Sequence, residues 1–359
     1  MLRRIPGLLL SWFAVNRREM EWRSDPLPYY VWVSEIMLQQ TRVEAVRPYF
    51  HRFVTALPDI SALAACPEDR LLKLWEGLGY YSRVRNLQKA ARIVMERYDG
   101  RLPADADKLR ELPGIGDYTA GAIASIAFGL PEPAVDGNVL RVLSRVTGSR
   151  LCIDEPKVKD SFRQMVRGMM GDGKDFPPGD LNQALMETGA LVCLPNGKAL
   201  CGGCPLEELC AARARGCIDE IPVRKEKKAR RIEERTVLVV RDATRTLLHR
   251  RPEKGLLAGL WELPNAAGHL TPEETLAHSR SLGLSPVRIT PLPEARHIFS
   301  HVEWRMTGYL VLTEEIGDCG PDMAVVESSA TERDYPIPAA FAAYTEYLNI
   351  RIGQKKYEA

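Results

Sequence analysis

Apolar residues recur at helical spacing through the first part of the chain. In VSEIMLQQTRVEAVRPYFHRFV, the apolar positions that follow this spacing are Val33, Ile36, Met37, Val43 and Val46. Residues 68–98 indicate two helices around the stretch WEGLGYYSRVRNL, and the Ala-rich stretch TAGAIASIAFG is typical of a buried helix. The helical pattern continues to about residue 192, interrupted by a Gly-, Asp- and Pro-rich loop over 171–180. The first part of the chain is therefore predicted to be mainly helical.

The pattern changes after a charged run, PVRKEKKARRIEER, which is typical of a solvated linker. TVLVVRD, TLLHRR and the alternating VEWRMTGYLVLTE predict strands, whereas PEETLAHSRSLGL and AAFAAYTEYLNIRI predict helices. We therefore predict a helical domain over residues 1–222, a linker over 223–234, a smaller α+β domain over 235–350 and a tail over 351–359.

Length and charge agree with this division. A chain of 359 residues with 45% hydrophobic content can bury two cores. The net charge is only +2, so any field that attracts nucleic acid must be local. No apolar stretch is long enough to cross a membrane. The first residues resemble a signal peptide but lack a small-residue cleavage site, so we expect a first helix and a cytoplasmic protein.

Residues 112–145 carry the densest concentration of candidate chemistry. Gly114 and Gly116 lie in a short LPGIG loop before the Ala-rich helix, and a helix start with a tight glycine turn suits a phosphate. Asp136 stands between Pro133 and Gly137 at the start of another helix. A carboxylate there can be a helix cap or a catalytic group, and the residues alone leave both open.

Five of the eight cysteines fall between residues 193 and 217. Four thiolates on one compact loop suit a [4Fe–4S] cluster or a four-cysteine zinc site. Only one C-x2-C pair is present, and zinc sites usually have two, so the spacing favours iron–sulfur. The expected ligands are Cys193, Cys201, Cys204 and Cys210, with Cys217 as an alternative.

Two further segments could act on nucleic acid. Glu35 lies among apolar residues and is either a surface glutamate or a partly desolvated general acid. Gly77 and Gly79 predict a turn that displays aromatic residues beside Arg83 and Arg85. Such a turn can wedge into a base stack, with the arginines on phosphates, or it can simply pack between helices.

Together these motifs resemble the MutY family of adenine DNA glycosylases, within the helix-hairpin-helix superfamily of base-excision enzymes. The resemblance rests on VSEIMLQQT, WEGLGYYSR, LPGIGDYTAGAI, PAVDGNVLRVLSR, the cysteine loop and the second domain, including GLLAGLWELPN. It implies a six-helix barrel with a hairpin over 112–123, an iron–sulfur loop over 193–210 and a Nudix-like α+β domain. The first cysteine gap is one residue longer than the C-x6-C-x2-C-x5-C pattern of the family.

The resemblance also implies roles for individual residues. Glu35 would protonate adenine, Asp136 would stabilise the positively charged sugar, and Tyr118 and Asn138 would orient them. Adenine would be removed opposite 8-oxoguanine or guanine in double-stranded DNA, after flipping out of the duplex. The residues expected to contact DNA or 8-oxoguanine are Gln40, Thr41, Leu78, Tyr80, Gly114, Gly116, Phe299, Ser300 and His301. Arg23 and Gln183 would line the adenine pocket.

The resemblance also bears on the type of reaction. Tyr118 occupies the position of the Schiff-base lysine of endonuclease III, which implies a monofunctional glycosylase. The Nudix-like domain lacks the REx2EE carboxylates, which implies lost phosphohydrolase activity. Two alternatives are a bifunctional glycosylase/lyase and a non-catalytic iron–sulfur DNA-binding protein, although a binding protein needs neither Glu35 nor Asp136. We expect a monomer.

Overall fold

The computed structural model describes residues 2–197, 199–226 and 229–352. It divides the chain into two compact units. The first comprises residues 1–65 and 86–227, and the second comprises residues 66–85 and 228–359. The second unit thus includes a short segment from within the helical part of the sequence. Parts of the predicted linker and tail, namely residues 227–228 and 353–359, lie outside the described residues.

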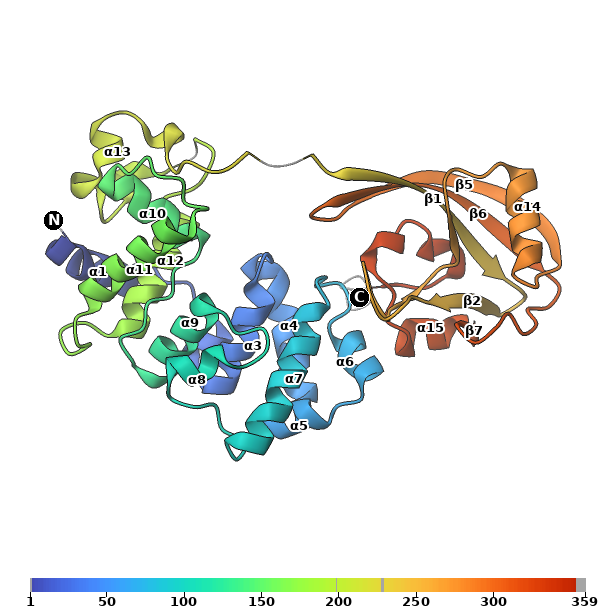
Figure 1. Ribbon diagram of the computed structural model, residues 1–359, viewed down its shortest axis with the longest axis horizontal. Coiled ribbons are helices and arrows are strands. Elements are labelled where there is room, and N and C mark those ends of the chain that lie inside the picture. The colour runs from blue at the N-terminus through green and yellow to red at the C-terminus, as the bar shows by residue number, and fades with distance from the viewer. Residues whose placement is uncertain (1, 198, 227–228, 353–359) are drawn as a thin grey trace. The chain divides into compact units, whose positions relative to one another are not determined.

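The first unit is built of helices (Figure 1). Their bounds are α1 (Ile5–Asn16), α2 (Glu21–Ser24), α3 (Pro28–Leu38), α4 (Val43–Ala56), α5 (Ile60–Ala65), α7 (Ser82–Arg97), α8 (Ala106–Arg110), α9 (Asp117–Phe128), α10 (Gly137–Thr147), α11 (Pro156–Met170), α12 (Pro178–Leu191) and α13 (Ala211–Ala214). Short 3₁₀ turns follow α12 at Cys201–Gly203, Glu207–Leu209 and Ile218–Glu220. Helix α7 begins in residues of the second unit and continues into the first.

Helix α12 lies at the centre of the helix packing in the first unit. It packs against α1 and α10 on one side and against α9 on another, and α9 in turn packs against α3. One hydrophobic core joins α1, α10, α11 and α12. Two glycines make the close approaches possible: a Cβ on Gly121 would lie 2.1 Å from the carbonyl oxygen of Pro133, and one on Gly189 would lie 2.5 Å from Asn138 Cβ. The packing brings α3, α9, α10 and α12 together at one site.

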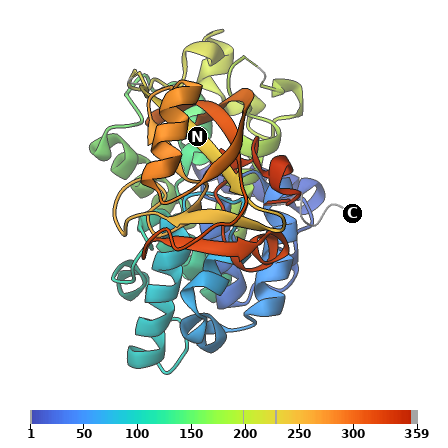
Figure 2. The same ribbon diagram turned by 90° about the vertical axis from the view of Figure 1, so that its right-hand side faces the viewer.

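The second unit contains a seven-stranded sheet (Figure 2). Its strands are β1 (Arg231–Arg241), β2 (Arg245–Arg250), β3 (Trp261–Glu262), β4 (Asn265–Ala267), β5 (Pro286–Ile298), β6 (Val302–Thr313) and β7 (Met323–Glu327). The order is β3-β2-β1-β6-β5, with β4 beside β1 and β7 beside β2. Strands β1 and β6 are parallel, and the other pairs are antiparallel. The unit also contains α6 (Glu68–Leu74), α14 (Pro272–Ser281) and α15 (Ser328–Asp334).

Alternation along β1 places side chains in two separate cores. Val237 and Val239 join the core that contains Trp304 and Phe341, whereas Leu238 and Val240 belong to another core with Leu247, Leu284, Tyr309, Val311 and Ile316.

The predicted class, a helical domain followed by a smaller α+β domain, is confirmed. No helix in the described part of the chain is long and apolar enough to cross a membrane.

One predicted helix is wrong. AAFAAYTEYLNIRI forms two 3₁₀ turns, Ala339–Phe341 and Thr345–Leu348. Phe341, Tyr344 and Leu348 are buried at the i, i+3, i+7 spacing of a helix. Two short turns can present the same spacing as one helix, so the pattern could not distinguish them. Asn349, with φ of 55°, then takes the left-handed conformation that caps the second turn.

Candidate active site

A pocket of about 650 Å³ opens in the first unit where α2, α3, α9, α10 and α12 meet. Among the sequence-predicted residues, those lining it are Arg23, Glu35, Thr41, Tyr118, Asp136, Asn138 and Gln183. These positions span 161 residues of chain, from 23 to 183, and only the packing of the helices brings them together. The pocket also contains groups that the sequence did not single out, chiefly Arg18 and Glu187.

Glu35 is buried on α3, with 6% of its surface exposed. Every residue from Val31 to Met37 is buried, because this helix lies inside the unit. The pKa of Glu35 is raised to about 7, mainly by burial and also by the nearby Asp136 charge, while the hydrogen bond from Tyr118 and the charge of Arg23 oppose the rise. The alternative that Glu35 is a surface glutamate is therefore wrong. A carboxyl with this pKa can hold a proton at neutral pH and release it to a substrate.

Tyr118, in the first turn of α9, holds Glu35 in place. Its hydroxyl lies 2.6 Å from Glu35 Oε2, to which it donates, and 3.2 Å from Met186 Sδ. Burial and the two neighbouring carboxyls raise the pKa of Tyr118 well above its ordinary value. The phenol therefore keeps its proton and acts as a fixed hydrogen-bond donor.

Asp136 is both a helix cap and a pocket residue. Its Oδ1 accepts from the backbone N–H of Val139 at 2.8 Å, and its Oδ2 accepts from Asn138 Nδ2 at 2.8 Å. Burial raises the pKa of Asp136, while these hydrogen bonds and the charge of Arg141 oppose the rise. The structure thus places a second carboxyl in the pocket of Glu35, with both of its oxygens held by donors.

A buried ion triad forms another wall of the pocket. Glu187 on α12 is 1% exposed and accepts from Arg18 Nε at 2.7 Å, Arg18 Nη2 at 3.0 Å and Arg23 Nη2 at 2.9 Å. Burial alone would raise the pKa of Glu187, but the hydrogen bonds from both arginines outweigh it and hold the pKa at about 2. Sequence reasoning missed Arg18 and Glu187. The available signal was that Glu187 follows the pocket candidate Gln183 by four residues, on the same helical face.

Arg141 connects the pocket to the cysteine loop. Its Nη2 donates to Asn138 Oδ1 at 2.7 Å and to the carbonyl of Gly189 at 2.8 Å, while its Nε donates to the carbonyl of Cys193 at 2.8 Å. One guanidinium group therefore contacts both the residue that holds Asp136 and the first predicted cluster ligand.

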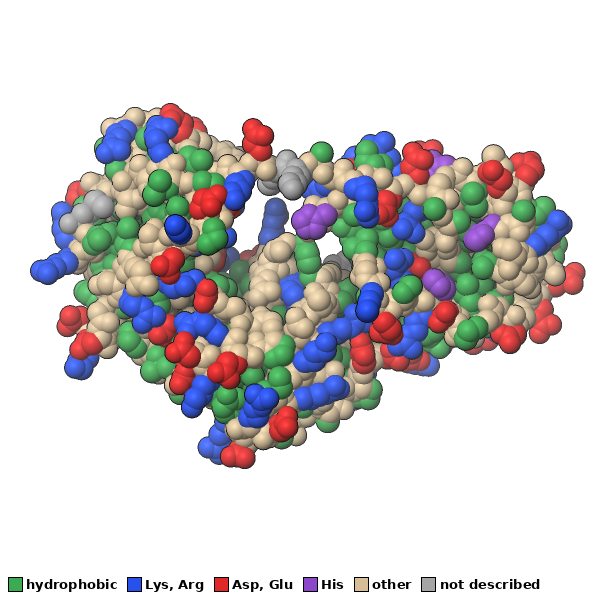
Figure 3. Space-filling view, viewed as in Figure 1, with side chains coloured by type: hydrophobic (Ala, Val, Ile, Leu, Met, Phe, Trp, Pro, Cys, Tyr) green, Lys and Arg blue, Asp and Glu red, His purple; other side chains and the backbone are tan. Residues whose placement is uncertain are grey.

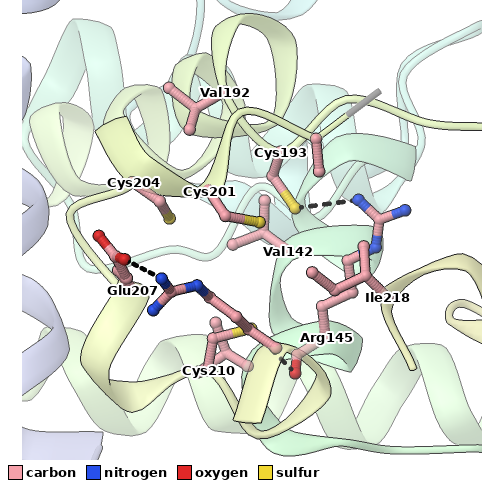
Figure 4. A pocket seen from close by; sticks show the side chains of 12 residues that line it. Val142, Arg145, Val192, Cys193, Cys201, Cys204, Glu207, Cys210 and Ile218 are labelled. Carbon is pink, nitrogen blue, oxygen red and sulfur yellow. Dashed lines mark hydrogen bonds and ion pairs between the residues drawn. The ribbon is translucent and has the colours of Figure 1, made fainter. Parts of the chain in front are cut away.

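Cys193, Cys201, Cys204 and Cys210 line one small cavity beside α10 (Figure 4). Their sulfurs face a common space, and none forms a disulfide. Arg145 Nη1 donates to Cys193 Sγ at 3.3 Å. The alternative ligand, Cys217, is not among the described residues that line this cavity, and it packs with Ala212 and Ile221 in a buried cluster that Cys210 also contacts.

Burial affects the protonation of two of these four thiols. Burial raises the pKa of Cys204 to about 11 and also raises that of Cys210. Thiolates at these positions therefore require a positively charged partner. In the described part of the chain, no three His, Cys, Asp or Glu side chains are grouped closely enough to hold a metal ion.

The hairpin predicted over 112–123 extends further in the structure, because α8 ends before residue 112 and α9 continues to Phe128, with the LPGIG turn between them. Asp105 caps α8, and Gly116 caps α9. Gly114 has φ of 80°, and a Cβ there would lie 2.9 Å from Asn86 Cβ, so this turn requires glycine on two grounds. Both glycines are exposed. On the face seen in Figure 3, Lys and Arg are interspersed with Asp and Glu, in keeping with the balanced net charge.

The remaining DNA-contact candidates divide between the units. Gln40 has φ of 61° in a turn after α3, in the first unit. In the second unit, Tyr80 is 46% exposed and its hydroxyl lies 2.6 Å from Ser300 Oγ. Leu78 and Tyr81 are only 7% and 5% exposed, so the turn displays Tyr80 but not these two side chains, and the prediction that it displays both tyrosines is wrong for Tyr81.

Beside Ser300, the ring of Phe299 packs edge-on against His297 and Trp304, and His301 is exposed. The two arginines expected on phosphates are engaged within this unit. Arg83 donates to the carbonyls of Leu78 and Gly79, and Arg85 donates to Glu68 and to the carbonyl of Ala258.

Comparison with known proteins identifies the family. Residues 33–167 match the model of the HhH-GPD superfamily base excision DNA repair proteins, and residues 236–347 match the NUDIX domain. The mouse adenine DNA glycosylase is 36% identical over 355 residues, covering 82% of this chain and 68% of the mouse protein. The chain belongs to the adenine DNA glycosylase family.

One further relative agrees with this assignment, and a solved structure supports the fold of the helical part. An adenine DNA glycosylase from Buchnera aphidicola is 34% identical, covering 72% of this chain and 74% of the bacterial protein. A thermostable thymine-DNA glycosylase has a similar structure, with a TM-score of 0.54 and 26% identity over 60% of this chain and 97% of its own. The predicted family, the helical glycosylase fold and the Nudix-like second domain are confirmed.

Proposed function

We propose that this chain is a monofunctional adenine DNA glycosylase, which removes adenine opposite 8-oxoguanine or guanine. The observation that carries the proposal is the shared pocket of Glu35 and Asp136, in a member of the adenine DNA glycosylase family. One carboxyl has its pKa raised to about 7, and the other is held by donors on both oxygens. Hydrolysis of a glycosidic bond uses two carboxyl groups in different environments.

The two carboxyl groups divide the reaction between them. Glu35 donates its proton to N7 of the flipped adenine, so the base leaves as a neutral species. Asp136, as a carboxylate, stabilises the positive charge that develops on the sugar. Glu35, now ionised, then accepts a proton from the water that attacks the sugar. Tyr118 holds Glu35 throughout, and Asn138 holds Asp136.

Tyr118 also supports the monofunctional assignment. A lyase of the endonuclease III type needs an amine that forms a Schiff base with the sugar, and a phenol cannot form one. Among the residues lining the pocket, the nitrogen-bearing side chains are arginine, asparagine, glutamine and tryptophan, with no lysine in the described lining. The product would therefore be an intact strand that carries an abasic site.

Around the flipped base, polar groups can read its edges. Arg23 and Gln183 line the pocket, and the Arg18–Glu187–Arg23 triad fixes the position of Arg23. The Gly114–Gly116 turn at the start of α9 would hold a backbone phosphate. Gln40, Thr41, Tyr80 and the Phe299–Ser300–His301 loop would contact the opposite base. We place this activity on chromosomal DNA in the cytoplasm.

The direct test of the proposed function uses three duplexes, with adenine opposite 8-oxoguanine, guanine or thymine. Purified protein should release adenine from the first two, and strands should break only after alkaline treatment. Strand cleavage without alkali would favour the bifunctional lyase. Binding without base release would favour a non-catalytic DNA-binding protein.

The pH dependence of base removal should report the proton on Glu35. Its pKa is raised to about 7, so the acid form is present below this pH and is lost as the pH rises through it. We expect single-turnover rates at saturating enzyme to fall as the pH increases above about 7. A rate that rises through this range would show that Glu35 does not act as the acid.

We also propose that Cys193, Cys201, Cys204 and Cys210 hold a [4Fe–4S] cluster. The donor set fits such a group, because four thiols face one cavity, and two of them, Cys204 and Cys210, have a pKa raised by burial and need a positive partner to ionise. A four-iron cluster is larger than a single ion, so its ligands are spread more widely than those of zinc. A bound cluster would supply electrostatic and structural support for the loop over 193–210, and no step of base removal passes through it.

The cluster proposal makes a prediction about metal content. Anaerobically purified protein should be brown and contain about four irons per chain. Cys201→Ala and Cys204→Ala should each lose most of the iron, whereas Cys217→Ala, which removes a buried thiol outside the cavity, should retain it. Colourless protein with one zinc would contradict the proposal, and iron loss only in the Cys217 variant would reassign the ligands.

A further inference from the structure

Glu76 is a buried carboxylate in the second unit that the proposed chemistry does not use. It lies just after α6 and is 4% exposed. Its Oε1 accepts from the backbone N–H of Ile337 at 2.8 Å, across 261 residues of chain, and from Lys73 Nζ at 3.0 Å. Lys73 Nζ also donates to the carbonyl of Tyr335 at 2.8 Å. One lysine and one glutamate thus bind two backbone groups of the loop after α15.

Glu76 directly precedes the turn that displays Tyr80. The next residue, Gly77, has φ of 99°, and it opens the turn that displays Tyr80. The turn is braced internally, since Trp75 Nε1 donates to the carbonyl of Gly79 at 3.0 Å. Glu76 is therefore the point at which a rigid turn is attached to the loop over 335–338.

A third tie lies on the far side of the turn. Arg85 Nη1 donates to the carbonyl of Ala258 at 2.8 Å. In the chain, Tyr80 lies between Glu76 and Arg85, and its hydroxyl contacts Ser300 Oγ. Residues 66–85 and the domain that follows residue 228 consequently form one structure around Tyr80 and Ser300.

We propose that Glu76 is a positioning residue that fixes the Gly77–Tyr81 turn on the loop over 335–338, and that selection of the base opposite adenine depends on it. This inference rests on the proposed function, because Tyr80 and Ser300 are the proposed contacts to the opposite base. Glu76 itself is buried and does not touch DNA. It acts by holding Tyr80 beside Ser300 before DNA binds, so that no ordering is needed on binding.

The test uses the full chain with Glu76→Ala, Glu76→Gln and Lys73→Met, and with Asp69→Asn as the matched control. Asp69 is an exposed carboxylate on α6, the helix that precedes Glu76. The first readout is hydrogen–deuterium exchange without DNA, in peptides covering 75–85 and 335–341. The second is the ratio of single-turnover rates on duplexes with adenine opposite 8-oxoguanine and opposite guanine.

Glu76→Ala should raise exchange in both segments, leave α3 unchanged and lower the rate ratio by about tenfold, equivalent to roughly 1.4 kcal/mol. Glu76→Gln keeps an acceptor for Ile337 and should show a smaller change, which carries the test if the alanine variant does not fold. Lys73→Met should fall between the control and Glu76→Ala.

Unchanged exchange in residues 335–341 would overturn the proposal, as would equal loss on both duplexes with an unchanged ratio. The exchange readout is independent of the proposed function. If the variants show the expected changes in exchange but wild-type protein releases no adenine, the proposed function is refuted and the attachment by Glu76 stands.

Discussion

Glu35→Gln and Asp136→Asn should each lower the single-turnover rate of adenine release by about 100- to 10,000-fold, while binding to the mispair is largely kept. Glutamine at 35 still accepts the hydrogen bond from Tyr118 but has no acidic proton for adenine. Asparagine at 136 still caps α10 but has no charge to stabilise the sugar. Removal of a general acid or of a transition-state charge has effects of this order.

The measurement compares rates at saturating enzyme with affinities for the same duplex, because both residues are proposed to act on the transition state. Glu96→Gln, at an exposed position on α7, is the matched control and should behave as wild type. The role assigned to either carboxyl is refuted if its variant releases adenine at a rate close to that of the control.

Glu187→Ala should destabilise the protein by about 3–5 kcal/mol, the range found when one partner of a buried ion pair is removed. The change leaves Arg18 and Arg23 without their shared buried carboxylate. Adenine release should also become slower, because Arg23 lines the pocket and loses its fixed position. Denaturant unfolding measures the first effect, and single-turnover rates measure the second.

The same triad determines how stability depends on pH. The folded pKa of Glu187, about 2, lies below its ordinary value of 4.5, so its contribution is fully present above pH 4.5 and is lost as the pH falls through about 2. Wild-type protein should lose this stability over that range, and Glu187→Ala should lose less. Arg18→Lys is the comparison variant, since it keeps the charge but not the paired hydrogen bonds. Equal pH dependence in wild type and Glu187→Ala would show that the triad does not stabilise the fold.

The sequence by itself determined which elements form and which chemical groups they carry. Helical spacing, the LPGIG turn and the alternation along VEWRMTGYLVLTE depend on residues a few positions apart, and each formed as predicted. The motifs also identified the family, since the order of short signatures along a chain is a property of the sequence. Where spacing was ambiguous, as in residues 339–352, local pattern failed because two 3₁₀ turns bury the same positions as a helix.

Only the tertiary structure decided the environment of each group. The pKa of Glu35 is raised because α3 is buried and because Asp136, 101 positions away, lies nearby, whereas Tyr118, 83 positions away, holds the carboxyl in place. Glu187 meets Arg18 across 169 positions, and Glu76 meets Ile337 across 261. A pKa and a buried ion pair depend on which distant groups share the same low-dielectric space, and no local pattern records that.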